Sequence, residues 1–143
     1  MTLTEFLLAR IAEDEEVARN ATVGPWWYDP SKMNAVDHEE SVFAGSRGPS
    51  AITVASTGPC DDIGSMADAA HIARHDPARV LAECEAKRRI VEEHRTVAYE
   101  DAEMNDVGTG CYTCGFADEE CETLLILATI YADHPDYDES WRL

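Results

Sequence analysis

The sequence has little positive charge. Its 143 residues include 11 lysines and arginines against 29 aspartates and glutamates, which gives a formal charge of −18 at pH 7. Because such a surface repels phosphate backbones and anionic membrane surfaces, we expect no direct binding of nucleic acid. A basic protein partner is compatible with this charge, and so is a surface that imitates nucleic acid. Many acidic proteins are merely soluble, so charge alone does not decide between these functions.

Long apolar runs are also missing. No run of roughly 18 apolar residues occurs, which excludes a membrane-spanning helix. The segment Met1–Glu5 lacks the basic and apolar regions that open a signal peptide. The cysteines are odd in number, and three of them are clustered with a spacing typical of metal sites rather than of disulfide frameworks. We therefore predict a reducing, cytoplasmic location.

Recognisable catalytic motifs are absent. The sequence contains no glycine-rich phosphate loop, nucleophile elbow or Ser/His/Asp ordering. His71 and His75 stand four residues apart on a predicted helix, which is a metal-ligand spacing, and Asp76 follows them. No nearby glutamate completes the pattern of a helix-borne metalloprotease, and Asp76 is expected to cap the next helix. A small metal-dependent enzyme using these three residues stays an alternative, and solvent or interface histidines are the favoured interpretation.

The length predicts a single domain over residues 1–143, and the patterns within it predict an α+β fold. A helix is expected over 1–22, opened at Thr4, with its apolar positions on one side. Gly24-Pro25 breaks it. Three strand-like segments then predict a small antiparallel β-meander over 25–57, with a polar loop over 30–40; they are Trp26–Tyr28, Ser41–Ala44 and Ile52–Ala55.

The second half is predicted to be mainly helical. A helical pair is expected over 65–94, with Ser65 capping the first helix and Asp76-Pro77 opening the second. A polar connection without pattern should follow over 96–110. Residues 108–143 are predicted to form a cysteine knuckle and a terminal helix that is almost uniformly apolar and therefore buried. The aromatic residues of the tail, Tyr137 and Trp141, are expected to fold back on the core.

Three thiols lie within eleven residues of one another in this last segment. Cys111 and Cys114 are separated by two residues and followed by Gly115, a pattern that forms a tight knuckle with both sulfurs directed at one centre. Cys121 should begin the terminal helix, whose N-terminus favours the thiolate form. Three converging thiolates suit a tetrahedral, structural Zn²⁺ that lacks one ligand.

His94 is the predicted fourth ligand, because it ends the long helix and a connection of sixteen residues can bring it to Cys111. His134 is the second choice. It lies some 20 Å beyond Cys121 along one helix, which is too far unless that helix ends early. The alternatives for the cluster are a redox Cys-x-x-Cys pair, free thiols and an iron–sulfur cluster. Cys84 is interpreted as a core residue and Cys60 as a loop thiol.

Five segments carry a resemblance to a known family: 24–26, 66–81, 87–94, 121–124 and 131–137. They resemble an uncharacterised family of small acidic proteins encoded by actinobacteria and their phages, with a C-terminal Cys-x-x-Cys…Cys-x-Thr-Leu motif. The resemblance implies no activity, but family members tend to have the histidine and the last cysteine, which supports His94 and Cys121 as ligands. The sequence departs from the family at Glu120, where proline is usual, and at Leu125, where arginine is usual.

From these observations we expect a non-enzymatic, zinc-stabilised protein-binding accessory or regulatory factor, plausibly phage-encoded and acting on a host protein. An acidic nucleic-acid mimic that blocks a host DNA- or RNA-binding protein is the first alternative. The small enzyme using His71, His75 and Asp76 is the second. The sequence specifies neither the partner nor the oligomeric state.

Overall fold

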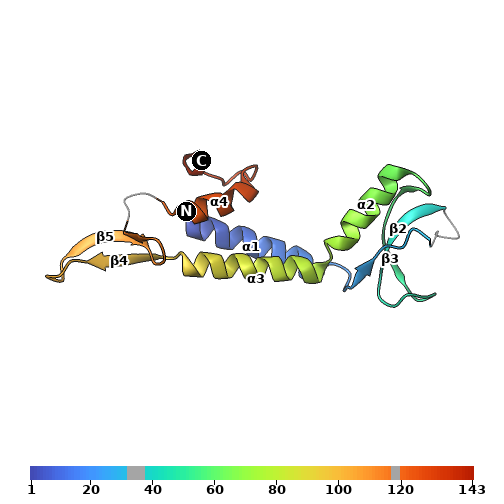
Figure 1. Ribbon diagram of the computed structural model, residues 1–143, viewed down its shortest axis with the longest axis horizontal. Coiled ribbons are helices and arrows are strands. Elements are labelled where there is room, and N and C mark those ends of the chain that lie inside the picture. The colour runs from blue at the N-terminus through green and yellow to red at the C-terminus, as the bar shows by residue number, and fades with distance from the viewer. Residues whose placement is uncertain (32–37, 117–119) are drawn as a thin grey trace. The chain divides into compact units, whose positions relative to one another are not determined.

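The computed structural model describes residues 1–31, 38–116 and 120–143, and it has an α+β fold (Figure 1). The chain divides into two compact units, one formed by residues 1–13 and 84–143 and the other by residues 14–83. Each unit contains one three-stranded antiparallel sheet, with strand orders β1-β2-β3 and β4-β5-β6. Most of the polar loop expected over 30–40 lies outside the described residues.

Helix α1 (Leu3–Asn20) begins with a reciprocal pair of hydrogen bonds. The Thr2 hydroxyl accepts from the Glu5 N–H at 3.2 Å, and the Glu5 carboxylate accepts from the Thr2 N–H at 2.8 Å. This capping box satisfies two amides that the first turn would leave unpaired. The expected helix start at Thr4 is therefore wrong by two residues, because the capping residue is Thr2. The overlooked signal is a threonine, Thr2, followed three positions later by a glutamate, Glu5.

The first sheet consists of β1 (Trp26–Trp27), β2 (Glu39–Ala44) and β3 (Ile52–Pro59), which confirms the predicted antiparallel meander. Most of the central strand β2 is buried, and its Val42 is fully inaccessible. The Trp27 ring stacks on Phe43 with 4.9 Å between centroids. Helix α2 (Ile63–Arg74) packs against all three strands, so this sheet has a hydrophobic core of its own.

The junction between β3 and α2 is tight. Asp62, rather than the predicted Ser65, caps α2 by accepting from the Ser65 N–H at 2.8 Å. The Ser65 hydroxyl donates to the same carboxylate, and the Thr57 hydroxyl donates to the Ser65 carbonyl at 2.7 Å. Gly58 has a φ of 135°, and a Cβ at this position would collide with the Ser65 Oγ. The end of the sheet is thus closely fitted to the start of the helix.

Helix α3 (Pro77–Glu93) begins where Asp76-Pro77 predicted, with the Asp76 carboxylate accepting from the Arg79 N–H at 2.9 Å. Cys84 is buried within it, as expected. In the part of α3 from Cys84 onwards, Lys87 donates to the Tyr131 hydroxyl at 3.0 Å, and Arg89 forms an ion pair with Glu85 at 3.0 Å.

The predicted polar connection over 96–110 is wrong. A second sheet occupies it, formed by β4 (Thr96–Glu100), β5 (Asp106–Cys111) and β6 (Gly115–Phe116). The sequence between Thr96 and Cys111 is rich in glycine and acidic residues, so the usual strand signal of buried apolar alternation is weak. Asp101 makes the hairpin turn possible, since its carboxylate accepts from the backbone amides of Glu103 and Asn105.

Helix α4 (Glu122–Ala128) is capped by Cys121, as predicted, and continues as the 3₁₀ helix η1 (Thr129–Tyr131). The expectation of a uniformly buried terminal helix is wrong, because Ile126 and Ile130 are 55% and 58% exposed. A second 3₁₀ helix, η2 (Glu139–Trp141), follows. The tail does fold back: both Tyr137 and Trp141 pack on the ring of Phe6 in α1, with centroids 5.9 and 5.1 Å away.

Candidate metal centre

Four side chains from four separate places in one unit converge on a single point. His94 directly follows α3, Cys111 is the last residue of β5, Cys114 lies in the turn before β6, and Cys121 caps α4. Their ligand atoms all lie within 4.8 Å of one another. In the described part of the chain, this is the one group of three or more histidine, cysteine or carboxylate donors arranged to hold a metal ion.

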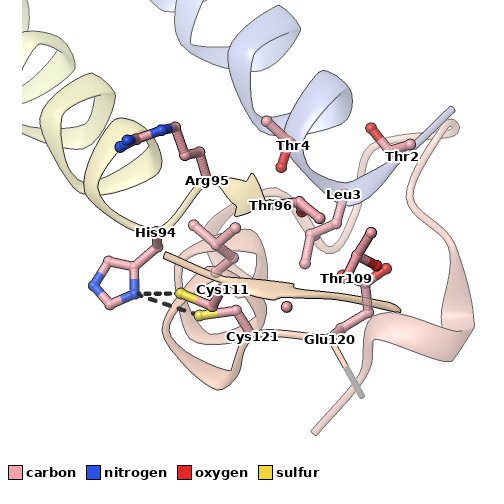
Figure 2. Close-up of a pocket in the computed structure, with 12 residues that line it drawn as sticks. Thr2, Leu3, Thr4, His94, Arg95, Thr96, Thr109, Cys111, Glu120 and Cys121 are labelled. Atoms are coloured by element: carbon pink, nitrogen blue, oxygen red, sulfur yellow. Dashed lines mark hydrogen bonds between the residues drawn. The ribbon is translucent and has the colours of Figure 1, made fainter. Parts of the chain in front are cut away.

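Four of the six separations between the donor atoms match those around a tetrahedral ion. With Zn–S bonds of about 2.3 Å and Zn–N bonds of about 2.0 Å, tetrahedral angles place two sulfurs about 3.8 Å apart and a sulfur and nitrogen about 3.5 Å apart. The Sγ atoms of Cys114 and Cys121 are 3.8 Å apart. The Nδ1 atom of His94 lies 3.4 Å from the sulfurs of Cys111 and Cys121 and 3.5 Å from that of Cys114. Figure 2 shows the His94 ring directed at two of the three sulfurs.

The knuckle has the local geometry that its spacing predicts. The Cys114 N–H donates to the Cys111 sulfur at 3.4 Å, which lets a backbone dipole favour the thiolate. Gly115 follows with a φ of 98°, a conformation that a side chain would strain. The Thr113 hydroxyl donates to the Glu93 carbonyl and so ties the knuckle to the end of α3.

Two further contacts hold the knuckle in place. The Tyr99 hydroxyl in β4 donates to the Cys111 carbonyl at 2.9 Å. The guanidinium of Arg95 lies 3.9 Å from the centre of the Tyr112 ring, and the Arg95 carbonyl accepts from the Tyr112 N–H at 2.9 Å. Such contacts orient the groups that bind a metal. Sequence reasoning missed Tyr99 and Arg95, because it assigned their segment to an unpatterned connection.

Two of the three thiols, those of Cys111 and Cys114, have strongly shifted pKa values. Burial raises the pKa of the Cys111 thiol, but hydrogen bonds from the Cys114 and Thr113 amides and from the neighbouring thiols outweigh burial and lower this pKa to about 6. The pKa of Cys114 rises to about 11, because its thiol donates to the sulfurs of Cys111 and Cys121 and is partly desolvated. A bound cation would favour three thiolates together.

A cavity of about 530 Å³ borders the cluster in the same unit. Its wall includes Cys111 and Cys121 on one side and Thr2, Leu3 and Thr4 at the start of α1 on another (Figure 2). Small solutes can therefore approach the cluster from this side. Cys114 is exposed, whereas Cys111 is buried.

The other histidines named from the sequence lie elsewhere. The His134 ring contacts Arg10, whose Nη1 atom is 2.6 Å from it, and it stacks edge-on against Phe6. His134 is not in the cluster, and the histidine that lies with the three cysteines is His94. His71 and His75 are adjacent, with ring centroids 4.4 Å apart, and the His75 Nδ1 lies 2.9 Å from the His71 carbonyl oxygen.

The fold and the donor set define a small α+β protein with a centre that can bind a metal ion. The model of a family of unknown function, DUF6221, matches residues 1–143, and the chain belongs to this family. No curated protein and no solved structure matches the chain. Among the described residues, no helix is both long and apolar enough to cross a membrane.

Proposed function

We propose that His94, Cys111, Cys114 and Cys121 hold a structural Zn²⁺, and that the chain is a non-enzymatic, zinc-stabilised protein-binding factor. The observation that carries the proposal is the donor set, three sulfurs and one nitrogen at tetrahedral separations. Zinc is favoured over Mg²⁺ or Ca²⁺ because those ions take oxygen ligands, whereas thiolate and imidazole suit zinc. Four protein donors leave no position for a catalytic water, which supports a structural role.

Zinc content tests the site directly. Protein purified without added zinc should contain one zinc per chain, measured by elemental analysis together with native mass. His94→Ala should lower the zinc affinity by tenfold or more, since a tridentate site remains. His134→Ala is the matched control, because His134 packs on α1 away from the cluster, and it should retain full zinc content. Protein that contains no zinc and cannot be loaded with it contradicts the proposal.

A surface groove supports the binding role. It lies in the unit formed by residues 14–83, has a volume of about 220 Å³, and is lined mainly by apolar side chains, including Val17, Ala18, Trp26 and Val80. Val17 is 72% exposed at its edge. A pocket lined by a tryptophan and aliphatic side chains can receive one large apolar side chain of a partner, as binding hot spots commonly do.

Charge indicates which kind of partner. Asp14 lines the groove, and two arginines on the helices that form it are already paired within those helices: Arg19 with Glu15, and Arg79 with Glu83. The whole chain carries −18. We therefore expect a basic segment that presents one bulky apolar residue between lysines or arginines.

Peptide display on the zinc-loaded protein tests this partner class. Enriched peptides should carry an apolar residue flanked by basic ones, and Val17→Glu should weaken their binding at least tenfold, or about 1.4 kcal/mol. Ile126→Glu is the control, since Ile126 is similarly exposed but lies in the other unit. Enrichment of acidic peptides, or binding that ignores Val17, contradicts the assignment.

The net charge favours a second candidate, an acidic mimic of nucleic acid. Such a mimic would bind a DNA- or RNA-binding protein through many carboxylates, and its affinity would fall steeply with salt. Binding through the apolar groove would keep most of its affinity at high salt. The enzyme alternative loses support because the Asp76 carboxylate accepts from the amides of Arg79 and Trp26, at 2.9 and 3.4 Å.

A further inference from the structure

The three sulfurs of the cluster differ in their access to solvent. Cys111 is buried, Cys121 is half-buried and Cys114 is exposed. We propose that Cys114 is an oxidation site: a peroxide converts Cys114 and Cys121 into a disulfide and thereby expels the metal. This inference rests on the proposed zinc site, and it adds a chemical trigger for opening that site.

The geometry favours this pair of sulfurs. The Sγ atoms of Cys114 and Cys121 are already 3.8 Å apart, so a modest movement brings them to bonding distance. Cys121 caps a helix and makes no side-chain hydrogen bond to it, which leaves its side chain able to turn. Cys111 is held more firmly, because β5 pairs it with Thr96 and with Gly115 and its sulfur accepts the Cys114 N–H.

The reaction balances with a peroxide as the oxidant. The Cys114 thiolate attacks one peroxide oxygen, the O–O bond breaks, and a sulfenic acid forms as hydroxide leaves. The Cys121 thiolate then attacks the Cys114 sulfur, which forms the S–S bond and expels a second hydroxide. Two thiolates lose two electrons and the peroxide gains them. The metal ion departs because only His94 and Cys111 remain as ligands, and reduction by a dithiol restores both thiolates.

Loss of the ion would release one part of the unit selectively. The bond between Cys114 and Cys121 keeps the knuckle joined to the start of α4. The link from both of them to His94 at the end of α3 is lost. In the oxidised protein, the knuckle should therefore stay joined to α4, while the backbone amides at the end of α3 lose protection from hydrogen exchange. The metal-free reduced protein should lose both connections.

The test treats the zinc-loaded full-length chain with one equivalent of hydrogen peroxide. We expect release of one zinc per chain, followed with a chromophoric chelator, in step with a disulfide that peptide mapping assigns to Cys114 and Cys121. Dithiothreitol and zinc should restore the starting state. A disulfide between Cys111 and Cys114, or oxidation that leaves zinc bound, overturns the inference while leaving the zinc site intact. A protein without zinc before oxidation overturns the proposed function instead.

Two variants distinguish zinc release caused by the Cys114–Cys121 disulfide from zinc release caused by oxidation of other thiols. Cys60→Ser removes a half-buried thiol outside the cluster and should leave the zinc release unchanged. Cys121→His keeps four donors, two sulfurs and two nitrogens, but removes the partner thiol. This variant should bind zinc and form no Cys114 disulfide with residue 121, and its zinc release per peroxide should fall severalfold. Equal release from both variants contradicts the assigned pair.

Discussion

The chain contains two three-stranded antiparallel sheets that are stabilised in different ways. Strand β2 of the first sheet is mostly buried, and α2 covers all three strands. In β4 and β5 of the second sheet, both fully described, the one buried residue is Cys111, and the others are exposed or half-buried. The first sheet is thus held by apolar burial, and the second offers little surface to bury.

The difference between the two sheets bears on the proposed metal site. A small antiparallel sheet without a hydrophobic face is marginal in water, because burial must offset the entropy of ordering its residues. The one buried side chain of β5 is a member of the donor cluster. Under the proposed function, a bound ion would supply the anchoring that a hydrophobic core supplies in the first sheet. Four measurements test whether the two sheets are stabilised in these different ways.

Removing the metal should have the largest effect. Structural zinc contributes on the order of 10 kcal/mol in small zinc-dependent domains. A chelator should therefore collapse the hydrogen-exchange protection of β5 amides such as Gly110, while the β2 amide of Val42 keeps its protection. Equal loss in both sheets would show that the second sheet is not singled out by the metal.

Val42→Ala is the reverse experiment. Because Val42 is fully buried in β2, its truncation should cost about 1.5–3 kcal/mol of the first sheet's stability. Chemical denaturation followed by tryptophan fluorescence measures this cost in a Trp141→Phe background, where only Trp26 and Trp27 emit, and the cost should be the same with zinc and with chelator. Val107→Ala is the matched control in β5; Val107 is 45% exposed, and the change should be nearly neutral.

One tyrosine in each unit offers a matched comparison. The Tyr28 hydroxyl donates at 2.7 Å to Glu40, a buried carboxylate, whereas the Tyr99 hydroxyl donates at 2.9 Å to the Cys111 carbonyl. Hydrogen bonds to charged groups contribute about 1.5–3 kcal/mol and neutral ones about 1 kcal/mol. Tyr28→Phe should therefore be the more destabilising change, while Tyr99→Phe alone should weaken zinc binding. A Tyr99→Phe variant with unaltered zinc affinity would remove Tyr99 from the support of the knuckle.

The smallest expected effect is a pH dependence of the first sheet. Desolvation, together with the hydrogen bond to Glu40, raises the pKa of Tyr28 from 10.0 to about 12. Since the folded pKa is the higher one, the stability that Tyr28 contributes is present below pH 10 and is lost as pH rises towards 12. Ultraviolet titration should find one tyrosine ionising near 12, and Tyr28→Phe should abolish it. Glu40→Gln should lower that pKa.

Sequence reasoning was most successful where local chemistry is strong. The Cys-x-x-Cys-Gly spacing, the cysteine at the start of α4 and the histidine at the end of α3 were enough to name the four residues that the structure brings together. The Asp76-Pro77 start of α3 and the first meander follow from similarly local signals. In the second sheet, by contrast, register depends on hydrogen bonds across the hairpin and on contacts such as Tyr99 with Cys111. A pattern of apolar residues cannot reveal pairing that leaves few of them buried.

Gly58 restricts which substitutions the β3–α2 junction can tolerate during evolution. Replacing Ser65 by glycine would make room for a side chain at position 58, but the φ of 135° would still disfavour any L-residue there. A smaller residue at position 65 therefore cannot compensate for a larger side chain at position 58. Relatives that keep the β3–α2 junction should be nearly invariant at 58, while position 65 stays free to vary among small residues.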